Sequence, residues 1–277
     1  MVFIRHKLID MIEKFEIALR ESNMAENTIR AYIYAVNDYF SKYKTLNKRN
    51  LLLYKTNIIE LFKPKTVNLR IQALNKFLDQ VGKPKLRLKS VKVQQRSYLE
   101  NVISQADYIF FKKKLKQEKN IMWYFVVRFL TTTGARVSEL IQIKVEHVRI
   151  GYFDIYSKGG KVRRLFIPKR LRDEAGVWFE ETQQTTGYIF RNRFGERITT
   201  RGIAQQLKDY AERYGLNVNV VYPHSFRHRY AQNFLEAFND IALLADLMGH
   251  ESIETTRIYL RRTASEQQAI VDKVITW

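Results

Sequence analysis

The sequence has 277 residues, of which 48 are Lys or Arg and 28 are Asp or Glu, so its net charge is +20. A hydrophobic fraction of 45% supplies a folded core and excludes a disordered basic tail. The absence of cysteine excludes a disulfide scaffold, a cysteine-ligated zinc site, an iron–sulfur cluster and a cysteine nucleophile. A charge of this size favours a polyanionic partner, above all nucleic acid, over a protein that is basic only for solubility.

The sequence offers no segment suited to a membrane. Residues 121–130 form the most apolar stretch, which is too short to span a bilayer and contains Arg128. The N-terminal residues lack the apolar core and the cleavage site of a secretory signal. We therefore expect a cytoplasmic protein with no membrane partner, associated with the nucleoid if its partner is DNA.

Residues 1–82 have the apolar spacing of a helical bundle. Three segments place apolar side chains three or four residues apart, at Leu8, Ile12, Phe15 and Leu19, at Ile29, Ile33, Val36 and Phe40, and at Val67, Ile71, Leu74 and Leu78. A less regular apolar segment, 50–62, ends before Pro64, and Gly82 ends the last helix. The sequence thus predicts four helices that form one domain.

Residues 83–96 are predicted to link two domains. They include no acidic residue and six basic ones, namely Lys83, Lys85, Arg87, Lys89, Lys92 and Arg96. Such a segment repels itself into an extended form and buries little of its own surface. We predict that its basic side chains contact DNA phosphates; a solvated strap with no partner is the alternative.

Residues 97–277 are predicted to form a second domain, mostly helical, with a short sheet. Residues 152–156 and 164–168 are rich in β-formers and flank the glycine-containing turn 157–161, which predicts a β-hairpin with a lysine-bearing tip. The predicted fold class is therefore mainly α with a small antiparallel β-sheet, in two domains.

Motifs for nucleotide and metal chemistry are missing from the sequence. It contains no glycine-rich phosphate loop, no dinucleotide-binding turn and no His-Glu-x-x-His zinc motif. His224 and His228 are spaced like helical metal ligands, but Arg227 and Arg229 beside them would repel a cation. We expect neither a metal nor a cofactor.

Six residues of the second part could act together on a phosphate: Arg136, Lys158, His224, Arg227, His250 and Tyr259. Each of them alone has a structural explanation. Arg136 could form an ion pair with Glu139, Lys158 could be an ordinary turn residue, and Tyr259 could pack in the core. No single residue therefore decides the function.

The order of the motifs around these residues is more informative. The motifs are Thr-Gly-Ala-Arg-Val-Ser-Glu-Leu, Ser-Lys-Gly-Gly-Lys-Val-Arg-Arg, His-Ser-Phe-Arg-His, Met-Gly-His and Thr-Thr-Arg-Ile-Tyr. In this order they resemble the tyrosine recombinase (phage integrase) family, from about Ser97 to Arg262. The helical first part is similar to that family's core-binding domain. The resemblance implies a two-domain clamp, with a mixed α/β catalytic domain.

The resemblance also implies an active site made of Arg136, Lys158, His224, Arg227, His250 and Tyr259, supported by Glu139. Of the two hairpin lysines, Lys158 matches the family's catalytic lysine because it precedes the glycine pair. His250 would donate a hydrogen bond to the phosphate. Ala135 and Met248 depart mildly from the family pattern, which usually has a larger apolar residue and Leu there.

These residue types suit the attack on a phosphodiester. Arg136 and Arg227 offer planar guanidinium forks to the non-bridging oxygens, which gain charge in the transition state. Tyr259 would attack with His224 as its base, while Lys158 would protonate the leaving 5′-oxygen. The product would be a 3′-phosphotyrosyl bond and a free 5′-hydroxyl, so rejoining would need neither metal nor nucleotide.

Other functions stay open at this point. A type IB topoisomerase, by resemblance, shares this fold and nucleophile; a DNA-binding protein of the same fold without catalysis and a metal-dependent nuclease are further alternatives. The small helical first domain and the short chain favour the recombinase. The full set of candidate residues argues against a passive binder, and the lack of metal ligands argues against the nuclease.

Resemblance to simpler, Xer-like members implies a homotetramer on two DNA sites, each an inverted repeat of double-stranded DNA bound by two protomers. The role could be cointegrate resolution, integration and excision, or separation of replicon dimers; the DNA target, directionality and accessory proteins stay open. Ile270, Val274 and Trp277 form the stripe of an amphipathic C-terminal helix. We expect this helix to dock on a neighbouring protomer; folding back onto its own domain is the alternative.

Overall fold

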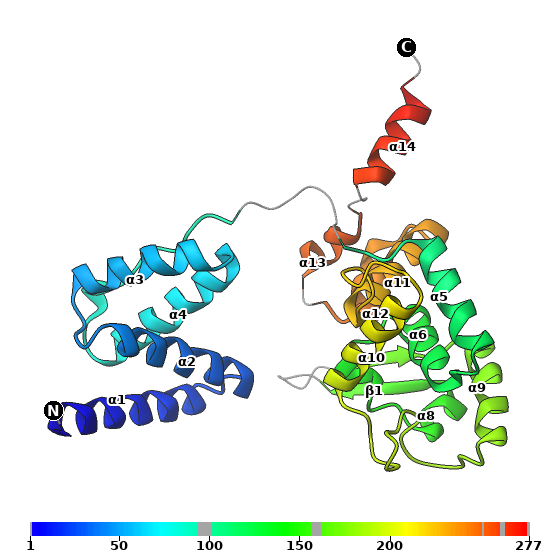
Figure 1. Ribbon diagram of the computed structural model, residues 1–277, viewed down its shortest axis with the longest axis horizontal. Coiled ribbons are helices and arrows are strands. Elements are labelled where there is room, and N and C mark those ends of the chain that lie inside the picture. The colour runs from blue at the N-terminus through cyan, green and yellow to red at the C-terminus, as the bar shows by residue number, and fades with distance from the viewer. Residues whose placement is uncertain (1, 94–100, 157–161, 251, 261–263, 276–277) are drawn as a thin grey trace. The chain divides into compact units, whose positions relative to one another are not determined.

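The computed structural model describes residues 2–93, 101–156, 162–250, 252–260 and 264–275. The chain divides into two compact units, Met1–Gln95 and Arg96–Trp277, which we call the first and the second unit. Each has its own hydrophobic core. Helices dominate both units, and the sheet found in the described residues has two antiparallel strands (Figure 1). The predicted fold class, mainly α with a small antiparallel sheet, is confirmed.

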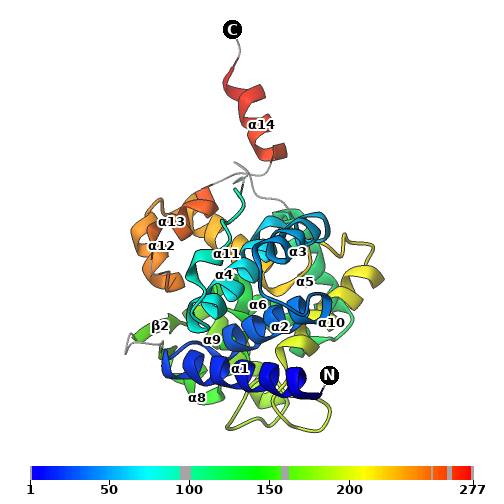
Figure 2. The same ribbon diagram turned by 90° about the vertical axis from the view of Figure 1, so that its left-hand side faces the viewer.

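The described part of the first unit contains α1 (Val2–Glu21), α2 (Glu26–Lys42), α3 (Lys48–Leu61), α4 (Pro64–Gln80) and the 3₁₀ helix η1 (Pro84–Leu86). α2 lies beside α1 and packs against α4 (Figures 1 and 2). The rings of Phe15 in α1 and Phe77 in α4 meet edge to face, with their centroids 5.2 Å apart. Burying such rings removes apolar surface from water and holds the helices together.

The basic segment that follows α4 is held against the first unit, and we call its residues 84–92 the strap. Asn75 of α4 donates to the carbonyl of Leu88 at 2.9 Å and accepts from its N–H at 2.8 Å. Two turns earlier in α4, Asn68 makes the same pair of hydrogen bonds with Val91, at 3.0 and 2.8 Å. Leu88 is buried in the core of the first unit, at 5% exposure.

The sequence predicts that residues 83–96 form an extended linker that buries little surface, because its charges repel one another. For residues 84–91 this prediction is wrong, because they pack against the first unit. The charge count overlooked the apolar residues Leu86, Leu88 and Val91, which pack against the bundle and outweigh the repulsion. The basic side chains of this part of the chain stay exposed, at Lys83, Lys85, Arg87, Lys89 and Lys92. The predicted contact residue Arg96 lies outside the described residues.

The described part of the second unit contains α5 (Gln105–Gln117), α6 (Ile121–Thr133), α7 (Val137–Leu140), α8 (Val145–Ile150), β1 (Tyr152–Tyr156), β2 (Val162–Phe166), α9 (Lys169–Glu181), α10 (Thr200–Arg213), α11 (Pro223–Ala237), α12 (Ile241–Met248), α13 (Ile253–Arg257), η2 (Ile258–Leu260) and α14 (Ala264–Val274). α6 is central, in contact with α5, α9 and α11 (Figure 1). Phe125 of α6 stacks on Trp178 of α9, with the ring centroids 4.7 Å apart.

The two strands form the predicted hairpin, with Tyr152 opposite Phe166 and Tyr156 opposite Val162. β2 begins at Val162 rather than at Arg164, because strand pairing continues to the end of β1. The predicted tip, 157–161, with its lysine Lys158, lies outside the described residues.

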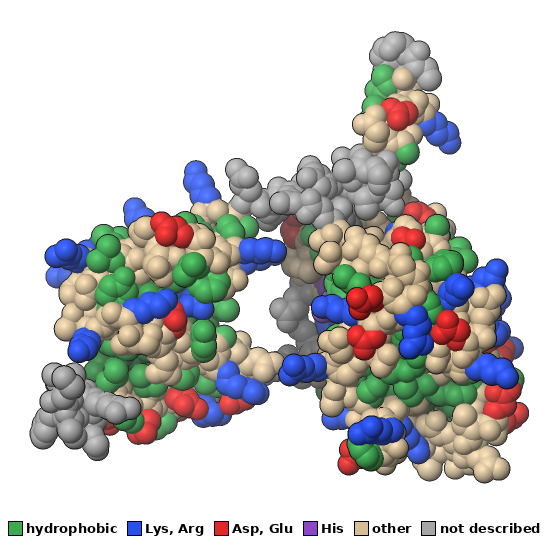
Figure 3. Space-filling view, in the orientation of Figure 1, with side chains coloured by type: hydrophobic (Ala, Val, Ile, Leu, Met, Phe, Trp, Pro, Cys, Tyr) green, Lys and Arg blue, Asp and Glu red, His purple; other side chains and the backbone are tan. Residues whose placement is uncertain are grey.

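Lys and Arg side chains occur on the visible faces of both units (Figure 3). None of the described helices is long and apolar enough to cross a membrane.

Candidate active site

The turn after α6 determines where Arg136 lies. α6 ends at Gly134, whose φ of 64° is in the left-handed region that favours glycine. A Cβ on Gly134 would lie 2.4 Å from Cδ1 of Tyr230, so packing also requires glycine here. The chain then enters α7 with Arg136 as its N-cap. The Arg136 side chain is 38% exposed, so its guanidinium is accessible to a ligand.

Glu139 is a buried carboxylate that contacts several arginines. It accepts from the Arg136 backbone N–H at 2.7 Å and from Arg136 Nη1 at 2.8 Å. Nη2 of Arg163 lies 2.6 Å from Oε2, and Nη1 of Arg227 lies 3.9 Å from the same oxygen. Burial opposes the charged form, but Arg163 and Arg136 outweigh it and lower the pKa of Glu139. Glu139 is therefore ionised at neutral pH.

Arg227 is held inside the second unit, where only 2% of its surface is exposed. Its Nη1 donates to the carbonyl of Gly134, and its Nη2 donates to the carbonyl of Met248 at 2.7 Å. The same Nη2 lies 3.2 Å from Nε2 of His250. Burial, followed by the charge of Arg136, lowers the pKa of Arg227 to about 10. The guanidinium is thus a cation at neutral pH, and these contacts fix its orientation.

Three arginines donate hydrogen bonds to backbone carbonyls at the C-terminal end of α12. The carbonyl oxygens of three successive residues, 247–249, accept hydrogen bonds from three different side chains. The donors are Arg163 at 2.6 Å, Arg227 at 2.7 Å and Arg136 at 3.3 Å. Carbonyls at a helix C-terminus lack helical partners and carry partial negative charge, so they satisfy cationic donors.

Tyr259 lies in η2 and is 8% exposed. Its ring stacks on the ring of His250, with centroids 5.7 Å apart and planes 13° from parallel. The ring of His228 lies on α11, with its centroid 4.9 Å from that of Tyr259. Two histidines thus hold the ring of the predicted nucleophile.

His250 is neutral at neutral pH. Burial, followed by the charges of Arg227 and Arg136, lowers its pKa to about 4. A guanidinium can only donate, so Nε2 of His250 accepts from Arg227. The ring proton is then on Nδ1, which lies 2.8 Å from Oγ1 of Thr256 and donates to it.

His224 lies in the first turn of α11, three residues before Arg227, so the two share a face of the helix. It is exposed. Partial desolvation, followed by the charges of Arg227 and Arg136, lowers the pKa of His224 below its ordinary value. A neutral imidazole at this position can accept a proton.

The structure brings five of the predicted site residues into direct contact: Arg136, Glu139, Arg227, His250 and Tyr259. His224 is adjacent to them on α11. Lys158 lies outside the described residues. Among the described residues, no group of three His, Asp or Glu side chains is placed to hold a metal ion.

Two residues of this cluster were missed from the sequence, Arg163 and His228. Arg163 is followed by Arg164, and nothing in the motif distinguishes one from the other. Strand alternation could have separated them, because neighbouring side chains in a strand point to opposite faces. Arg164 is the exposed one and pairs with Asp154 at 2.8 Å. The spacing of His228 from His224 suggests only a metal ligand, whereas its contact with Tyr259 depends on the tertiary fold.

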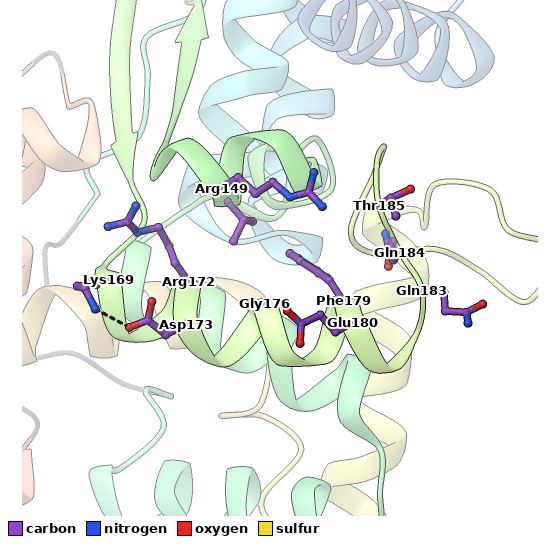
Figure 4. Close-up of a pocket in the computed structure, with 11 residues that line it drawn as sticks. Arg149, Lys169, Arg172, Asp173, Gly176, Phe179, Glu180, Gln183, Gln184 and Thr185 are labelled. Carbon is purple, nitrogen blue, oxygen red and sulfur yellow. Dashed lines mark hydrogen bonds and ion pairs between the residues drawn. The ribbon is translucent and has the colours of Figure 1, made fainter.

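A cleft of about 620 Å³ lies elsewhere on the second unit (Figure 4). Its walls come from α8, α9 and the segment that follows α9. It is lined by Val148, Arg149, Lys169, Arg172, Asp173, Gly176, Phe179, Glu180, Gln183, Gln184 and Thr185. None of the predicted site residues lines it.

Comparisons with known proteins identify the family and the fold. The sequence profile of the phage integrase family matches residues 99–266. Tyrosine recombinase XerA of Pyrococcus furiosus is 27% identical, over 95% of this chain and 93% of its own length. The TnP I resolvase of Bacillus thuringiensis is 26% identical, over 91% of this chain and 95% of its own length.

Solved structures share the fold. A lambda integrase dimer bound to a COC′ core site superposes with a TM-score of 0.73 at 14% identity, covering 97% of this chain and 78% of that one. The Tn1549 transposon integrase in complex with circular intermediate DNA gives 0.69 at 15% identity, covering 95% and 99%. Because the profile matches more than half of the sequence, the chain belongs to the phage integrase family, the tyrosine recombinases.

Proposed function

We propose that this chain is a site-specific DNA recombinase that breaks and rejoins DNA strands through a covalent bond between Tyr259 and a DNA phosphate. Membership of the family supports the assignment of the class of reaction. The observation that supports the residue roles is the packing of Tyr259 against His250, which is itself bonded to the buried Arg227. A phosphate bound by Arg136 and Arg227 would therefore lie beside the phenol.

The arginines would bind the scissile phosphate. Arg136 presents an exposed fork, and Arg227 presents a desolvated cation whose position is fixed by backbone carbonyls. Negative charge grows on the non-bridging oxygens as the phosphorus is attacked. Preorganised donors stabilise that charge without reorganising during the reaction, which lowers the barrier.

Tyr259 would attack the phosphorus while His224 takes up the phenolic proton. His224 suits this role because its lowered pKa keeps the imidazole unprotonated at neutral pH. The phosphorus–5′-oxygen bond breaks as the bond to tyrosine forms, and Lys158 would give its proton to the leaving oxygen. The 3′-phosphotyrosine retains the energy of the broken bond, so a 5′-hydroxyl of another strand can reverse the step.

His250 would change partner when DNA binds. A phosphate beside the ring favours its protonated form, because opposite charges stabilise each other. The imidazolium would then donate from Nε2 to the phosphate while Nδ1 stays bonded to Thr256. His250 would thus respond to the bound substrate.

The partner would be double-stranded DNA whose core sites are inverted repeats, bound by a homotetramer on two sites. Two structurally similar proteins support DNA as the partner, namely the lambda integrase bound to a core site and the Tn1549 integrase in complex with circular intermediate DNA. The first unit would act as the core-binding domain, with Lys83, Lys85, Arg87, Lys89, Lys92 and Arg96 on phosphates. The enzyme would work on DNA in the nucleoid of the cytoplasm, in element integration and excision, cointegrate resolution or separation of replicon dimers.

The test uses a nicked suicide substrate in the presence of a chelator. The wild-type chain should form a covalent protein–DNA adduct, while Tyr259→Phe should form none and still bind the site, since only the attacking oxygen is lost. Tyr156→Phe removes an exposed hydroxyl of the same unit and should react normally. An adduct in Tyr259→Phe would assign the nucleophile elsewhere, and no adduct in the wild type would favour a passive DNA-binding protein.

A further inference from the structure

Arg163 is a buried arginine that has no role in the proposed mechanism. It lies in β2, and its side chain is 9% exposed. Nη2 is 2.6 Å from Oε2 of Glu139, and Nη1 donates to the carbonyl of Leu247 at 2.6 Å. One side chain therefore joins the hairpin to the carboxylate under Arg136 and to the end of α12.

The chain around Gly249 is shaped to admit this side chain. Gly249 has a φ of 61°, and a Cβ on it would lie 2.4 Å from Cδ of Arg163. The aliphatic stem of Arg163 thus crosses a position where only glycine fits. The next residue is His250, so Arg163 lies against the turn that carries a proposed phosphate ligand.

Charge gives a second reason for Arg163. Glu139 contacts Arg136 directly and lies 3.9 Å from Arg227, so it offsets part of the charge that these arginines would offer to a phosphate. Arg163 compensates the carboxylate from the side buried in the protein. A cluster without Arg163 would have one positive charge less, in surroundings where charges interact strongly.

We propose that Arg163 is a positioning residue for strand cleavage: it holds Glu139 and the 247–249 turn so that Arg136, Arg227 and His250 face one phosphate. It does not touch the substrate, because it is buried beneath these groups. The inference rests on the proposed roles of Arg136 and Arg227.

The experiment compares Arg163→Gln with Arg164→Gln, which makes the same change of charge at the next position of β2, on the exposed face. Single-turnover adduct formation and half-site binding are measured for both. Arg163→Gln should cleave about 10²-fold more slowly, the cost of misplacing catalytic groups by about 1 Å. Its half-site affinity should match that of Arg164→Gln. Equal cleavage rates in the two variants would overturn the inference.

Arg163→Gln leaves a buried carboxylate with fewer partners, so the variant could lose activity because it unfolds. Further variants distinguish unfolding from a loss of positioning. Arg163→Lys keeps the charge and should recover part of the rate, whereas a purely electrostatic role predicts full recovery and would remove the positioning claim. Arg163→Gln should combine with Glu139→Gln less than additively, since both act through one contact. Additive losses would contradict the proposal.

Failure of this inference and failure of the proposed function are distinguishable. If Arg136→Gln and Arg227→Gln cleave normally, the proposed active site is wrong and Arg163 has nothing to position. If those two variants are inactive and Arg163→Gln is not, only the inference about Arg163 fails.

Discussion

At the scale of single residues, the candidate site shows how the buried Arg227 is held mainly by groups without a full negative charge, although Glu139 lies 3.9 Å away. The donors of Arg227 bond backbone carbonyls of Gly134 and Met248, which carry partial charges. A carboxylate in each of these places would satisfy the same donors and cancel the cation. Carbonyl partners therefore leave the charge available to a phosphate.

The roles of Lys158 and Arg136 predict different responses to a modified substrate. Lys158→Ala should slow cleavage by removing the proton for the leaving 5′-oxygen, and a 5′-bridging sulfur, which leaves without protonation, should restore much of the rate. Arg136→Ala should lose about 10²–10³-fold through charge stabilisation, and sulfur should not rescue it. The measurement is the single-turnover rate on both substrates. Equal rescue of both variants would contradict the assigned roles.

His228 and His250 should make the second unit sensitive to acid. The pKa of each falls from 6.5 to about 4 in the folded chain, so below 6.5 the unfolded state binds more protons. The stability they provide is complete above about pH 6.5 and decreases as the pH falls toward 4. At about pH 5.5 the loss should be on the order of 1 kcal/mol for each group.

Urea unfolding at pH 7.5 and at about pH 5.5 measures this loss. His228→Gln and His250→Gln should each depend less on pH over this range than the wild type does. A variant with unchanged pH dependence would show that its histidine does not titrate with folding.

At the scale of elements, α4 both packs into the helical bundle and binds the strap. Its apolar face packs into the bundle, and its asparagines Asn68 and Asn75 bind the backbone of the strap at Val91 and Leu88. Residues seven apart lie on the same face of a helix, so the two amides hold consecutive parts of the strap. The exposed basic side chains of the strap, among them Lys89 between the two contacts, are thereby kept on the surface.

This strap should make DNA binding dependent on salt. Each phosphate contact contributes about −0.9 to the slope of log affinity against log salt, so changing four of its residues to Gln should make the slope shallower by up to about 3–4 units. The residues are Lys85, Arg87, Lys89 and Lys92. The matched control changes four lysines of α5 to Gln, at Lys112, Lys113, Lys114 and Lys116. A slope altered equally in both variants would mean that the strap has no special role.

At the scale of the whole molecule, the two units have separate cores, and α14 leaves apolar side chains uncovered. Val271 is 49% exposed and Val274 is 56% exposed, although both belong to the apolar side of an amphipathic helix. When a partner protein covers exposed aliphatic side chains of this kind, the removal of apolar surface from water stabilises the complex. This observation favours docking of the helix on another protomer over the fold-back alternative.

Deletion of residues 269–277 tests that docking. The truncated chain should remain folded and bind one half-site, because α14 contributes little to the core of its own unit. It should lose cooperative filling of the second half-site and strand exchange, which gel-shift titration and a recombination assay measure. A melting temperature many degrees lower, or unchanged cooperativity, would instead support folding back.

Local patterns in the sequence were sufficient to predict the helices of the first unit and the two strands, and they also supplied the candidate residues of the site. Apolar spacing predicts helices because burial follows the helical period, and the order of short motifs carried the family resemblance. The strap was mispredicted because a count of charges does not weigh the burial of Leu88 or the amides of Asn68 and Asn75.

What the sequence by itself determined is which residue types are present and in which order, and hence the class of chemistry. Only the tertiary structure decided how they meet: three arginines, from the N-cap of α7, from β2 and from α11, converge on the end of α12, and Tyr259 stacks on His250. These contacts join positions separated by 84 or 113 residues in two cases. No local pattern encodes such pairings, because they follow from the packing of whole elements around the core of the second unit.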